Sequence, residues 1–548
     1  MTQGNEITGV EALASGALAG GLRVLTGYPG SPATGLWEAI VEFGRRGKRP
    51  SKQLLHAEWS VNEKVAFEIA FGAAAAGLPS LVVTKGVGFN VLVDPMMTAN
   101  LSGVRGGLVV AVGDDPGAAW SQNEQDTRPL AAACQLPVLE PTSIGRAAET
   151  MRVAFELSRQ LALPFVLRFT RAFAQAAAPL RSVPSAAQTR RCVEADADFP
   201  ADGRLRATAR RAVHLHQELY QQLDEAARVA DEVDLNEYGP ATDASRGVVT
   251  VGYAATLFER AAREATAPLA VARLTTSFPL PERRLAAFLG GLSEVLVLEE
   301  GGPFAETGLR AMAQRRGLEV AILGRDTGHL PRVGELTPEQ VRYGLSFRPT
   351  AQAPSEPGRG AHAGFCQNCP FVPVFELLAD LRPELEAKRS RPLFVADPGC
   401  AVYADLPPFE LLDVKQVLGS SIAIGIGLSH VLPGRRVVAI TGDGAFFHSG
   451  MQALIDAASQ RVPLGVIVLD NESAAMTGFQ STPIEVATGG RKIQRPSLAE
   501  SARACGAGRV SRVSAGSRLT LARRLKQLLF SRRLEVLIVT GRCPRPPQ

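Results

Sequence analysis

The feature that most constrains this chain is a Gly-Asp-Gly turn at the end of a buried strand. Residues 437–440 are a continuous apolar run, which is typical of a strand covered on both faces of a parallel sheet. The run leads into Gly442-Asp443-Gly444, where glycine lets the backbone turn sharply and approach a ligand closely. A helix is predicted at 449–459, and a second apolar strand at 464–469 ends at Asp470-Asn471.

The ends of these two strands are a predicted ligand site. If the strands are parallel neighbours, Asp443 and Asn471 meet at their carboxyl ends, where open α/β sheets bind ligands. A carboxylate and an amide oxygen are hard ligands, suited to a Mg²⁺ that also holds a diphosphate. We expect thiamine diphosphate with Mg²⁺ at this site, and the alternative is a loop turn without a ligand.

Length and composition indicate a globular α/β protein of about three domains. At 548 residues the chain exceeds the ~250–300 residues over which one core usually grows. A net charge of +5 over this length is too diffuse to predict nucleic-acid binding. The N-terminus shows no secretory pattern, and the most apolar stretch, 65–84, contains Glu68 and Pro79. We therefore expect neither a signal peptide nor a membrane span, and a cytoplasmic location.

Helical and strand patterns alternate along the chain and divide it into segments. Their repetition predicts mostly parallel sheets covered on both faces: two doubly wound α/β domains that flank a smaller α/β domain. Helices are expected at 5–19, 36–43 and 65–76 of the first domain, and as two short pieces within 206–232. The predicted segments are an N-terminal domain (1–185), a polar connector (186–246), a middle domain (247–345), a linker rich in Pro, Ala and Gly (346–364) and a C-terminal domain (365–548).

Short motifs spread along nearly the whole chain resemble one known family. They are Gly4-Asn5-Glu6, Tyr28-Pro29-Gly30-Ser31-Pro32, residues 56–66 (HAEWSVNEKVA), residues 114–117 (DDPG), residues 121–128 (SQNEQDTR), residues 276–281 (TSFPLP), residues 334–339 (GELTPE), residues 442–450 (GDGAFFHSG) and residues 475–478 (AMTG). Together they are similar to the α subunit of indolepyruvate:ferredoxin oxidoreductase, in the 2-oxoacid:ferredoxin oxidoreductase superfamily. The match is weakest in the connector.

The resemblance implies a fold and an activity. It implies a thiamine-diphosphate-binding fold, with a pyrimidine-type first domain, a middle domain like the transketolase C-terminal domain, and a diphosphate-type last domain. The implied enzyme is the catalytic subunit of a 2-oxoacid oxidoreductase that converts an aryl- or indole-pyruvate into acyl-CoA and CO₂.

The resemblance also assigns the cofactor residues. Glu63 is implied to contact N1′ of the thiamine pyrimidine, with Glu58 as second candidate and a solvated helix-start glutamate as the alternative. Because Glu63 and Asp443 lie in different domains, the cofactor is expected to bridge an interface within one chain or between two. The implied Mg²⁺ ligands are Asp443, Asn471 and Ser473, and Gly442 and Gly444 admit the diphosphate.

Four cysteines of the last domain form a second candidate site. By itself Cys366-Gln367-Asn368-Cys369 is compatible with a zinc half-site, a redox pair or two buried thiols. The resemblance implies that Cys366, Cys369, Cys400 and Cys543 hold a proximal [4Fe–4S] cluster. Cys134, Cys192 and Cys505 are expected to be ordinary thiols.

Three departures from the family pattern stand out. The family's α subunit normally ends in a ferredoxin-like domain with two cluster motifs, whereas this sequence ends at Pro547-Gln548. Electrons from a proximal cluster are therefore expected to pass to a separate acceptor. Phe371 follows Cys369-Pro370 where the family usually has His, and Gly86 stands where Gln is common.

Three further residues are candidates for substrate contact or proton transfer. Ser31 resembles the hydroxyl residue that contacts the 2-oxoacid, although it is equally suited to bracing its own turn. Arg128 is compatible with a substrate carboxylate or with a structural ion pair. His448 is compatible with a proton shuttle near the thiazolium or with a packing role at a helix start.

The partners follow from the resemblance as well. We expect coenzyme A as acyl acceptor, a smaller γ-type (β) subunit, a ferredoxin or another electron acceptor, and a dimer of heterodimers. The first alternative is a non-oxidative thiamine-dependent decarboxylase or carboligase. The second alternative is a non-catalytic partner subunit that retains the fold.

Overall fold

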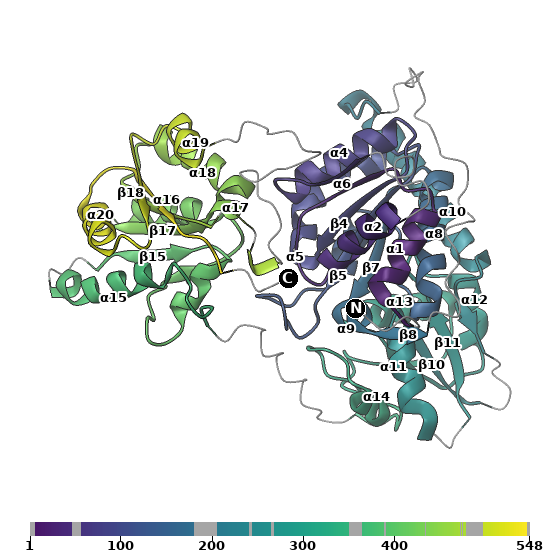
Figure 1. Ribbon diagram of the computed structural model, residues 1–548. Helices are drawn as coiled ribbons and strands as arrows, with labels where there is room; N and C mark the ends of the chain where they lie inside the picture. The colour runs from purple at the N-terminus through teal and green to yellow at the C-terminus, as the bar shows by residue number, and fades with distance from the viewer. Residues whose placement is uncertain are drawn as a thin grey trace. The chain divides into compact units, whose positions relative to one another are not determined.

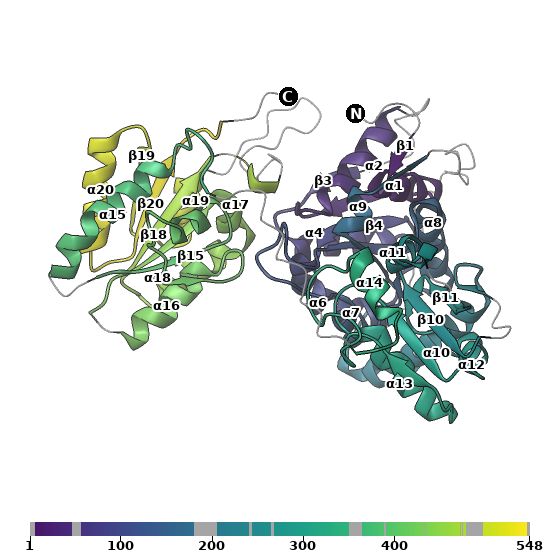
Figure 2. The same cartoon turned by 90° about the horizontal axis from the view of Figure 1, so that it is seen from below.

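The computed structural model describes residues 6–46, 56–179, 205–239, 244–264, 268–349, 364–387, 391–432, 434–471, 473, 475–477 and 497–544. The chain divides into two compact units, Met1–Gly360 and Ala361–Gln548. Each unit has its own sheets and cores (Figures 1 and 2).

A seven-stranded sheet organises the N-terminal part of the first unit, with the strand order β12-β6-β7-β5-β4-β2-β3. Neighbouring strands pair in parallel except β12 and β6, which are antiparallel. The central strands are buried along almost their whole length because helices cover both faces. The strands are β2 (Val24–Gly27), β3 (His56–Trp59), β4 (Ser80–Lys85), β5 (Leu108–Asp114), β6 (Val138–Leu139), β7 (Phe165–Thr170) and β12 (Thr276–Phe278).

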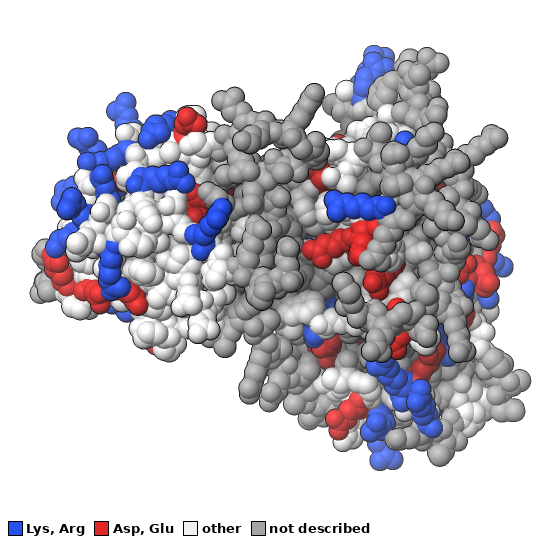
Figure 3. Space-filling view, in the orientation of Figure 1, with Lys and Arg blue, Asp and Glu red and all other residues white. Residues whose placement is uncertain are grey.

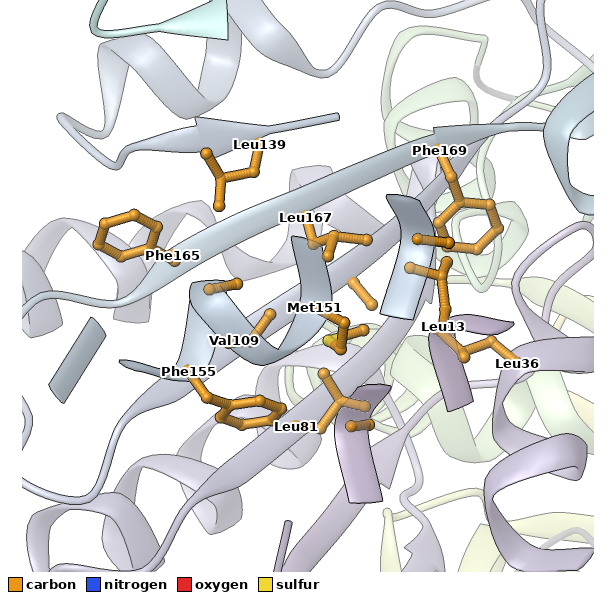
Figure 4. Close-up of a cluster of buried hydrophobic side chains, with 14 of the residues drawn as sticks. Leu13, Leu36, Leu81, Val109, Leu139, Met151, Phe155, Phe165, Leu167 and Phe169 are labelled. Atoms are coloured by element: carbon orange, nitrogen blue, oxygen red, sulfur yellow. The ribbon is translucent and has the colours of Figure 1, made fainter. Parts of the chain in front are cut away.

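Two hydrophobic cores lie on the two faces of this sheet. On one face Leu13, Leu36 and Met151 pack against the strand residues Leu81 and Val109 (Figure 4). The helices of that face are α1 (Gly9–Ala19), α2 (Thr34–Arg46) and α8 (Ile144–Leu161). The other face is covered by α4 (Glu63–Ala75), α6 (Val93–Ser102) and α7 (Arg128–Ala133), next to the short helix α5 (Gly86–Phe89). The remaining elements here are α9 (Arg171–Gln175) and the antiparallel pair β1 (Glu6–Thr8) and β8 (Ala177–Pro179).

A second sheet of the first unit has five strands in the order β14-β13-β10-β11-β9. Its strands are β9 (Glu237–Tyr238), which is antiparallel, and the parallel strands β10 (Arg246–Val251), β11 (Ala270–Leu274), β13 (Glu294–Leu298) and β14 (Ala321–Leu323). One face is covered by α12 (Glu282–Leu289) and α13 (Phe304–Arg316), the other by α11 (Ala254–Ala261) and α14 (Pro338–Gly344).

The structure differs from the sequence prediction at two helices. The connector contains a single 24-residue helix, α10 (Ala209–Glu232), rather than two short ones, because no Gly or Pro interrupts it. The first helix begins at Gly9 rather than near residue 5, since Thr8 caps it through a reciprocal pair of hydrogen bonds with Glu11. The N-terminal part of the connector and most of the predicted linker lie outside the described residues.

The second unit is a six-stranded, fully parallel sheet in the order β16-β15-β17-β18-β20-β19. Helices α15 and α20 pack on one face, and α16, α18 and α19 pack on the other (Figure 1). These sheets confirm the predicted α/β class with parallel strands. The elements are β15 (Leu393–Ala396), β16 (Val414–Lys415), β17 (Val437–Gly442), β18 (Leu464–Asp470), β19 (Arg509–Ser514), β20 (Glu535–Thr540), α15 (Val372–Ala387), α16 (Ser421–Val431), α17 (Asp443–Ala445), α18 (Met451–Ser459), α19 (Leu498–Ala504) and α20 (Arg518–Phe530).

The positive charge of the chain is concentrated in this unit and is not diffuse. Residues 501–548 contain 11 Lys and Arg but one Asp or Glu, which is more than the whole excess of +5. Lys and Arg side chains predominate on the face of the second unit seen in Figure 3. Two basic residues of α20 tie it to α15, since Arg518 pairs with Glu376 at 2.7 Å and Lys526 pairs with Glu384 at 3.0 Å. Among the described residues, no helix combines the length and apolar character that a bilayer crossing requires.

A buried network of ion pairs joins the two sheets of the first unit. Arg168, within β7, contacts Asp114 at the end of β5 with Nε and Oδ2 2.6 Å apart. Arg128, at the start of α7, contacts Glu299, which follows β13, at 2.7 Å. Both guanidinium groups also donate to the Glu300 carbonyl, at 2.9 and 3.0 Å. Since both arginines are completely buried, these contacts hold the two sheets together without competition from water.

Replacing Arg168 tests this network. We expect Arg168→Met to lower the free energy of unfolding by about 3–5 kcal/mol, because it leaves buried carboxylates without their partner. Urea unfolding of the full chain measures the change. The control is Arg152→Met, whose exposed pair with Glu156 should contribute less than about 1 kcal/mol. Equal effects of the two substitutions would contradict the role assigned to Arg168.

Candidate functional site

The Gly-Asp-Gly turn lies where the sequence placed it. Strands β17 and β18 are parallel neighbours with Gly442 opposite Leu469, so Asp443 and Asn471 both follow carboxyl ends of adjacent strands. Asp443 is buried and begins α17, where its Oδ1 accepts a hydrogen bond of 2.8 Å from the Gly444 amide. A Cβ added to Gly442 would meet nothing within 4 Å, which leaves room beside the turn for a bulky ligand.

The two other predicted Mg²⁺ ligands are held close together. The Ser473 amide donates to Oδ1 of Asn471 at 3.4 Å, and Ser473 is buried. One carboxylate and one amide oxygen at adjacent strand ends therefore form a hard-oxygen donor set of the kind that Mg²⁺ prefers. These residues fit the predicted cofactor.

His448 lies on a π-helical turn directly after α17. The turn spans Phe446–Gly450, so α18 begins two residues later than predicted. His448 is buried, with Nδ1 3.1 Å from Oγ of Ser449, whose hydroxyl donates to the Leu418 carbonyl at 3.0 Å. A π turn is rare and frequently marks a functional site. The hydrogen bond from Ser449 to the Leu418 carbonyl holds Ser449 in place, and Ser449 in turn positions the His448 imidazole.

Four of the five cysteines of the second unit, Cys366, Cys369, Cys400 and Cys543, gather in one region. Gly541, two residues before Cys543, packs against Pro370, since a Cβ added there would lie 2.7 Å from Cβ of Pro370. Burial, together with the charges of Cys369, Cys543 and Cys366, raises the pKa of Cys400 to about 12. Burial also raises the pKa of Cys543, whereas a hydrogen bond from Asn471 lowers it.

The cysteines influence one another electrostatically, but they are not arranged as a finished metal site. Within the part of the chain that the structure describes, no group of three or more His, Cys, Asp and Glu side chains has the geometry to hold a metal ion. Four thiols from neighbouring loops are nevertheless the donor set that an iron–sulfur cluster requires.

Glu63 occupies a buried position at the first turn of α4. The helix is capped by Asn62, whose side chain accepts a 2.9 Å hydrogen bond from the Val65 amide. A Cβ added to Gly88 would lie 2.3 Å from Oε1 of Glu63, so glycine at this position is what admits the carboxylate. Glu58, in contrast, is 44% exposed and pairs with His56 at 3.3 Å. Burial therefore favours Glu63 over Glu58 as the cofactor residue.

The substrate role considered for Arg128 does not fit the structure. Its guanidinium is completely buried and is bound by Asp126, Glu299 and two backbone carbonyls. Burial raises the pKa of the Asp126 carboxyl, but the charges of Arg128 and Arg168 outweigh burial and hold that pKa well below its usual range. The structural ion pair, the alternative stated from the sequence, describes Arg128 correctly.

Gly86 has a physical reason to lack a side chain. A Cβ at this position would lie 2.5 Å from Oδ1 of Asp114, one of the carboxylates that bind Arg168. A larger residue at position 86 would therefore displace the end of the ion network.

Ser31 lies in a partly exposed turn after β2. Thr34 braces this turn, because its hydroxyl accepts a 2.9 Å hydrogen bond from the Gly30 amide. Lys85, at the end of β4, is not among the residues predicted from the sequence, and its side chain runs along Gly30. The sequence feature that could have identified Lys85 is a single charged residue at the end of an otherwise apolar, buried strand.

Comparison with known families defines the class of protein. Residues 15–234 match the family "Pyruvate flavodoxin/ferredoxin oxidoreductase, thiamine diP-bdg". Residues 400–539 match "Thiamine pyrophosphate enzyme, C-terminal TPP binding domain". Together with the parallel sheets, these matches define a thiamine diphosphate-dependent enzyme that acts on 2-oxoacids.

Individual relatives narrow the class to one family. The indolepyruvate oxidoreductase subunit IorA of Methanothermobacter thermautotrophicus is 33% identical over 491 residues, which cover 87% of this chain and 76% of the relative. The same subunit of Archaeoglobus fulgidus is 31% identical over 503 residues, with the same coverage. The chain belongs to the indolepyruvate oxidoreductase subunit IorA family and is the catalytic subunit of a 2-oxoacid oxidoreductase.

A solved structure shares the fold. A 2-oxoglutarate:ferredoxin oxidoreductase from Magnetococcus marinus superimposes with a TM-score of 0.50 over 62% of this chain and 64% of its own, at 15% identity. At this identity the likeness supports the architecture alone.

The contact between Gly88 and Glu63 generates a prediction about cofactor affinity. We expect Gly88→Ala to weaken thiamine diphosphate binding about 10- to 100-fold, because the added methyl group displaces Glu63 and removes a hydrogen bond to a charged group. Calorimetric titration with thiamine diphosphate and Mg²⁺ measures the affinity. Gly72→Ala is the control, since a Cβ at this exposed position of α4 meets nothing within 4 Å. If Gly88→Ala binds as tightly as the control, Glu63 is not a cofactor residue.

Proposed function

We propose that this protein catalyses the oxidative decarboxylation of an aryl- or indole-pyruvate to acyl-CoA and CO₂. The observation that carries the oxidative assignment is the position of the four cysteines, which gather beside the Asp443 and Asn471 pair in the second unit. The substrate class follows the name of the relatives, which are indolepyruvate oxidoreductase subunits.

The residues of this chain have separate proposed roles. The Mg²⁺ ligands are Asp443, Asn471 and Ser473. The diphosphate lies in the open space beside Gly442, and Gly444 also lets it approach the backbone. Glu63 holds a proton at N1′ of the pyrimidine. The buried imidazole of His448 transfers a proton close to the reacting atoms. When bound, thiamine diphosphate supplies the nucleophilic carbon and the electron sink for loss of CO₂.

The second proposed centre is a [4Fe–4S] cluster held by Cys366, Cys369, Cys400 and Cys543. When bound, it supplies one-electron transfer from the active site to a separate acceptor such as a ferredoxin. A smaller γ-type subunit and coenzyme A complete the proposed reaction, in a dimer of heterodimers. The proposal keeps the division of the chain into an N-terminal domain, a connector, a middle domain, a linker and a C-terminal domain.

Glu63 and Glu58 can be separated by matched substitutions. We expect Glu63→Gln to lower turnover of arylpyruvate by about 10²–10⁴-fold, because an amide holds no transferable proton at N1′. We expect Glu58→Gln to keep turnover within about threefold, since its carboxylate is half exposed. Turnover is measured anaerobically with a panel of 2-oxoacids and a dye acceptor on the chain purified with its partner subunit. A larger loss in Glu58→Gln would reverse the assignment.

The cysteines provide the test of oxidative chemistry. We expect anaerobically prepared protein to contain about four iron and four acid-labile sulfide ions per chain, the composition of one such cluster. Cys366→Ser should lose this iron, whereas Cys134→Ser should keep it, because Cys134 is a buried thiol of the first unit. Iron analysis and the visible absorption of the cluster are the measurements.

Absence of iron from the protein would support the non-oxidative alternative. If both variants lack iron and still release CO₂ and an aldehyde from arylpyruvate, the protein is a thiamine-dependent decarboxylase or carboligase. A chain that bound neither thiamine diphosphate nor iron, with its partner present, would be the non-catalytic subunit.

A further inference from the structure

Lys85 lies at the position of the seven-stranded sheet where ligands are expected. Strands β2 and β4 are parallel neighbours, but the chain leads from β2 outward to β3 and from β4 outward to β5, on opposite sides. The gap between β2 and β4 is therefore the topological switch point, and open α/β sheets bind ligands at its carboxyl end. Lys85 is the last residue of β4, and the turn with Ser31 follows β2.

The side chain of Lys85 is held in a fixed path toward this edge. A Cβ added to Gly30 would lie 2.6 Å from Cδ of Lys85, so the methylene stem lies against the turn that contains Ser31. Its ammonium donates a long hydrogen bond of 3.4 Å to the Trp120 carbonyl. Trp120 is fixed in turn, because its amide donates to Asp115 at 2.7 Å. The stem of Lys85 is thus positioned by packing, and the residue as a whole is half-buried.

The charge of Lys85 is less well compensated than that of its neighbours. Arg171 pairs with Asp115 at 3.1 Å and also with Glu335, and the exposed Lys64 pairs with Asp94 at 2.6 Å. In the described residues the Trp120 carbonyl is the contact of the Lys85 ammonium, and no ion pair is formed. Burial lowers the pKa of Lys85, while the more distant charges of Asp115 and Glu63 act against this change. The charge of a half-buried lysine without an ion-pair partner is stabilised by an incoming anion.

We propose that the Lys85 ammonium binds the carboxylate of the 2-oxoacid substrate at the switch point, beside Ser31. This inference rests on the proposed function, which supplies an anionic substrate. The substrate carboxylate supplies the anionic contact of the ammonium, while the Trp120 carbonyl keeps the ammonium in place. Because this contact exists before CO₂ leaves, its loss should affect substrate binding more than the chemical step.

The test uses a substrate analogue that cannot react. The probe is 3-phenylpropionate, which has the length of phenylpyruvate but no keto group, and the comparison ligand is its neutral amide, 3-phenylpropanamide. Calorimetric titration uses the full chain with thiamine diphosphate, Mg²⁺ and its partner subunit. We expect the wild-type protein to bind the acid at least tenfold more tightly than the amide.

Substitutions then assign this preference to one side chain. Lys85→Met should bind the acid at least tenfold more weakly and leave the amide unchanged, whereas Lys85→Arg should retain most of the preference. Lys64→Met should behave as wild type, because Lys64 is exposed and paired with Asp94. The thermal unfolding midpoint shows that each variant is folded, and Lys85→Met should not be lower than wild type, since it removes a desolvated charge.

Turnover separates failure of this inference from failure of the proposed function. In Lys85→Met we expect KM for arylpyruvate to rise at least tenfold and kcat to fall less than threefold. If wild type turns over arylpyruvate but Lys85→Met keeps its preference for the acid and its KM, the inference is wrong and the function stands. If wild type binds acid and amide equally, the inference is also overturned, and absence of any turnover rejects the function itself.

Discussion

The buried pairing of Arg128 and Arg168 with carboxylates is the interaction on which the first unit depends. Asp114 accepts hydrogen bonds from Nε of Arg168 and from the amide and hydroxyl of Thr127. This fixes the start of α7 against the end of β5. The shared Glu300 carbonyl ties the second sheet to the same point. Because uncompensated charges are costly in this interior, the network stabilises the observed arrangement of the carboxyl edge of the first sheet.

The candidate ligand residues of the first unit lie on the edge that this network holds. Asp114 excludes a side chain at Gly86, and Gly88 in the same short helix makes room for Glu63. Asp115, the neighbour of Asp114, binds the Trp120 amide and Arg171. A carboxylate, an ammonium and a hydroxyl, from Glu63, Lys85 and Ser31, are therefore placed by a scaffold whose own charges are already compensated.

How much of the site was predictable from sequence depended on whether local pattern or tertiary contact decides a residue's position. Asp443 and Asn471 follow two adjacent apolar strands, and parallel pairing brings the carboxyl ends of these strands together. The apolar pattern was therefore enough to predict that the two residues lie close to each other. Arg128 could not be interpreted this way, because its burial depends on Glu299 and Glu300, about 170 residues away in sequence. Lys85 was missed for the same reason, since its contacts with Gly30 and Trp120 arise only in the folded sheet. The π turn at His448 also has no periodic signature that separates it from an ordinary helix.

The choice of asparagine at position 471 follows from its two neighbours. Its Oδ1 accepts a hydrogen bond from Ser473, so this oxygen is on the side of the predicted Mg²⁺ ligands. Burial raises the pKa of Cys543, and the Asn471 side chain opposes this rise through a hydrogen bond, which requires an N–H donor directed at sulfur. An amide has one oxygen and one N–H₂ group and can serve both neighbours at once. Aspartate would present an oxygen and a negative charge to Cys543, and would raise the pKa of the thiol instead of lowering it. Asn471 therefore lies between the proposed Mg²⁺ ligands and the cysteines, and its amide can serve both neighbours from one strand end.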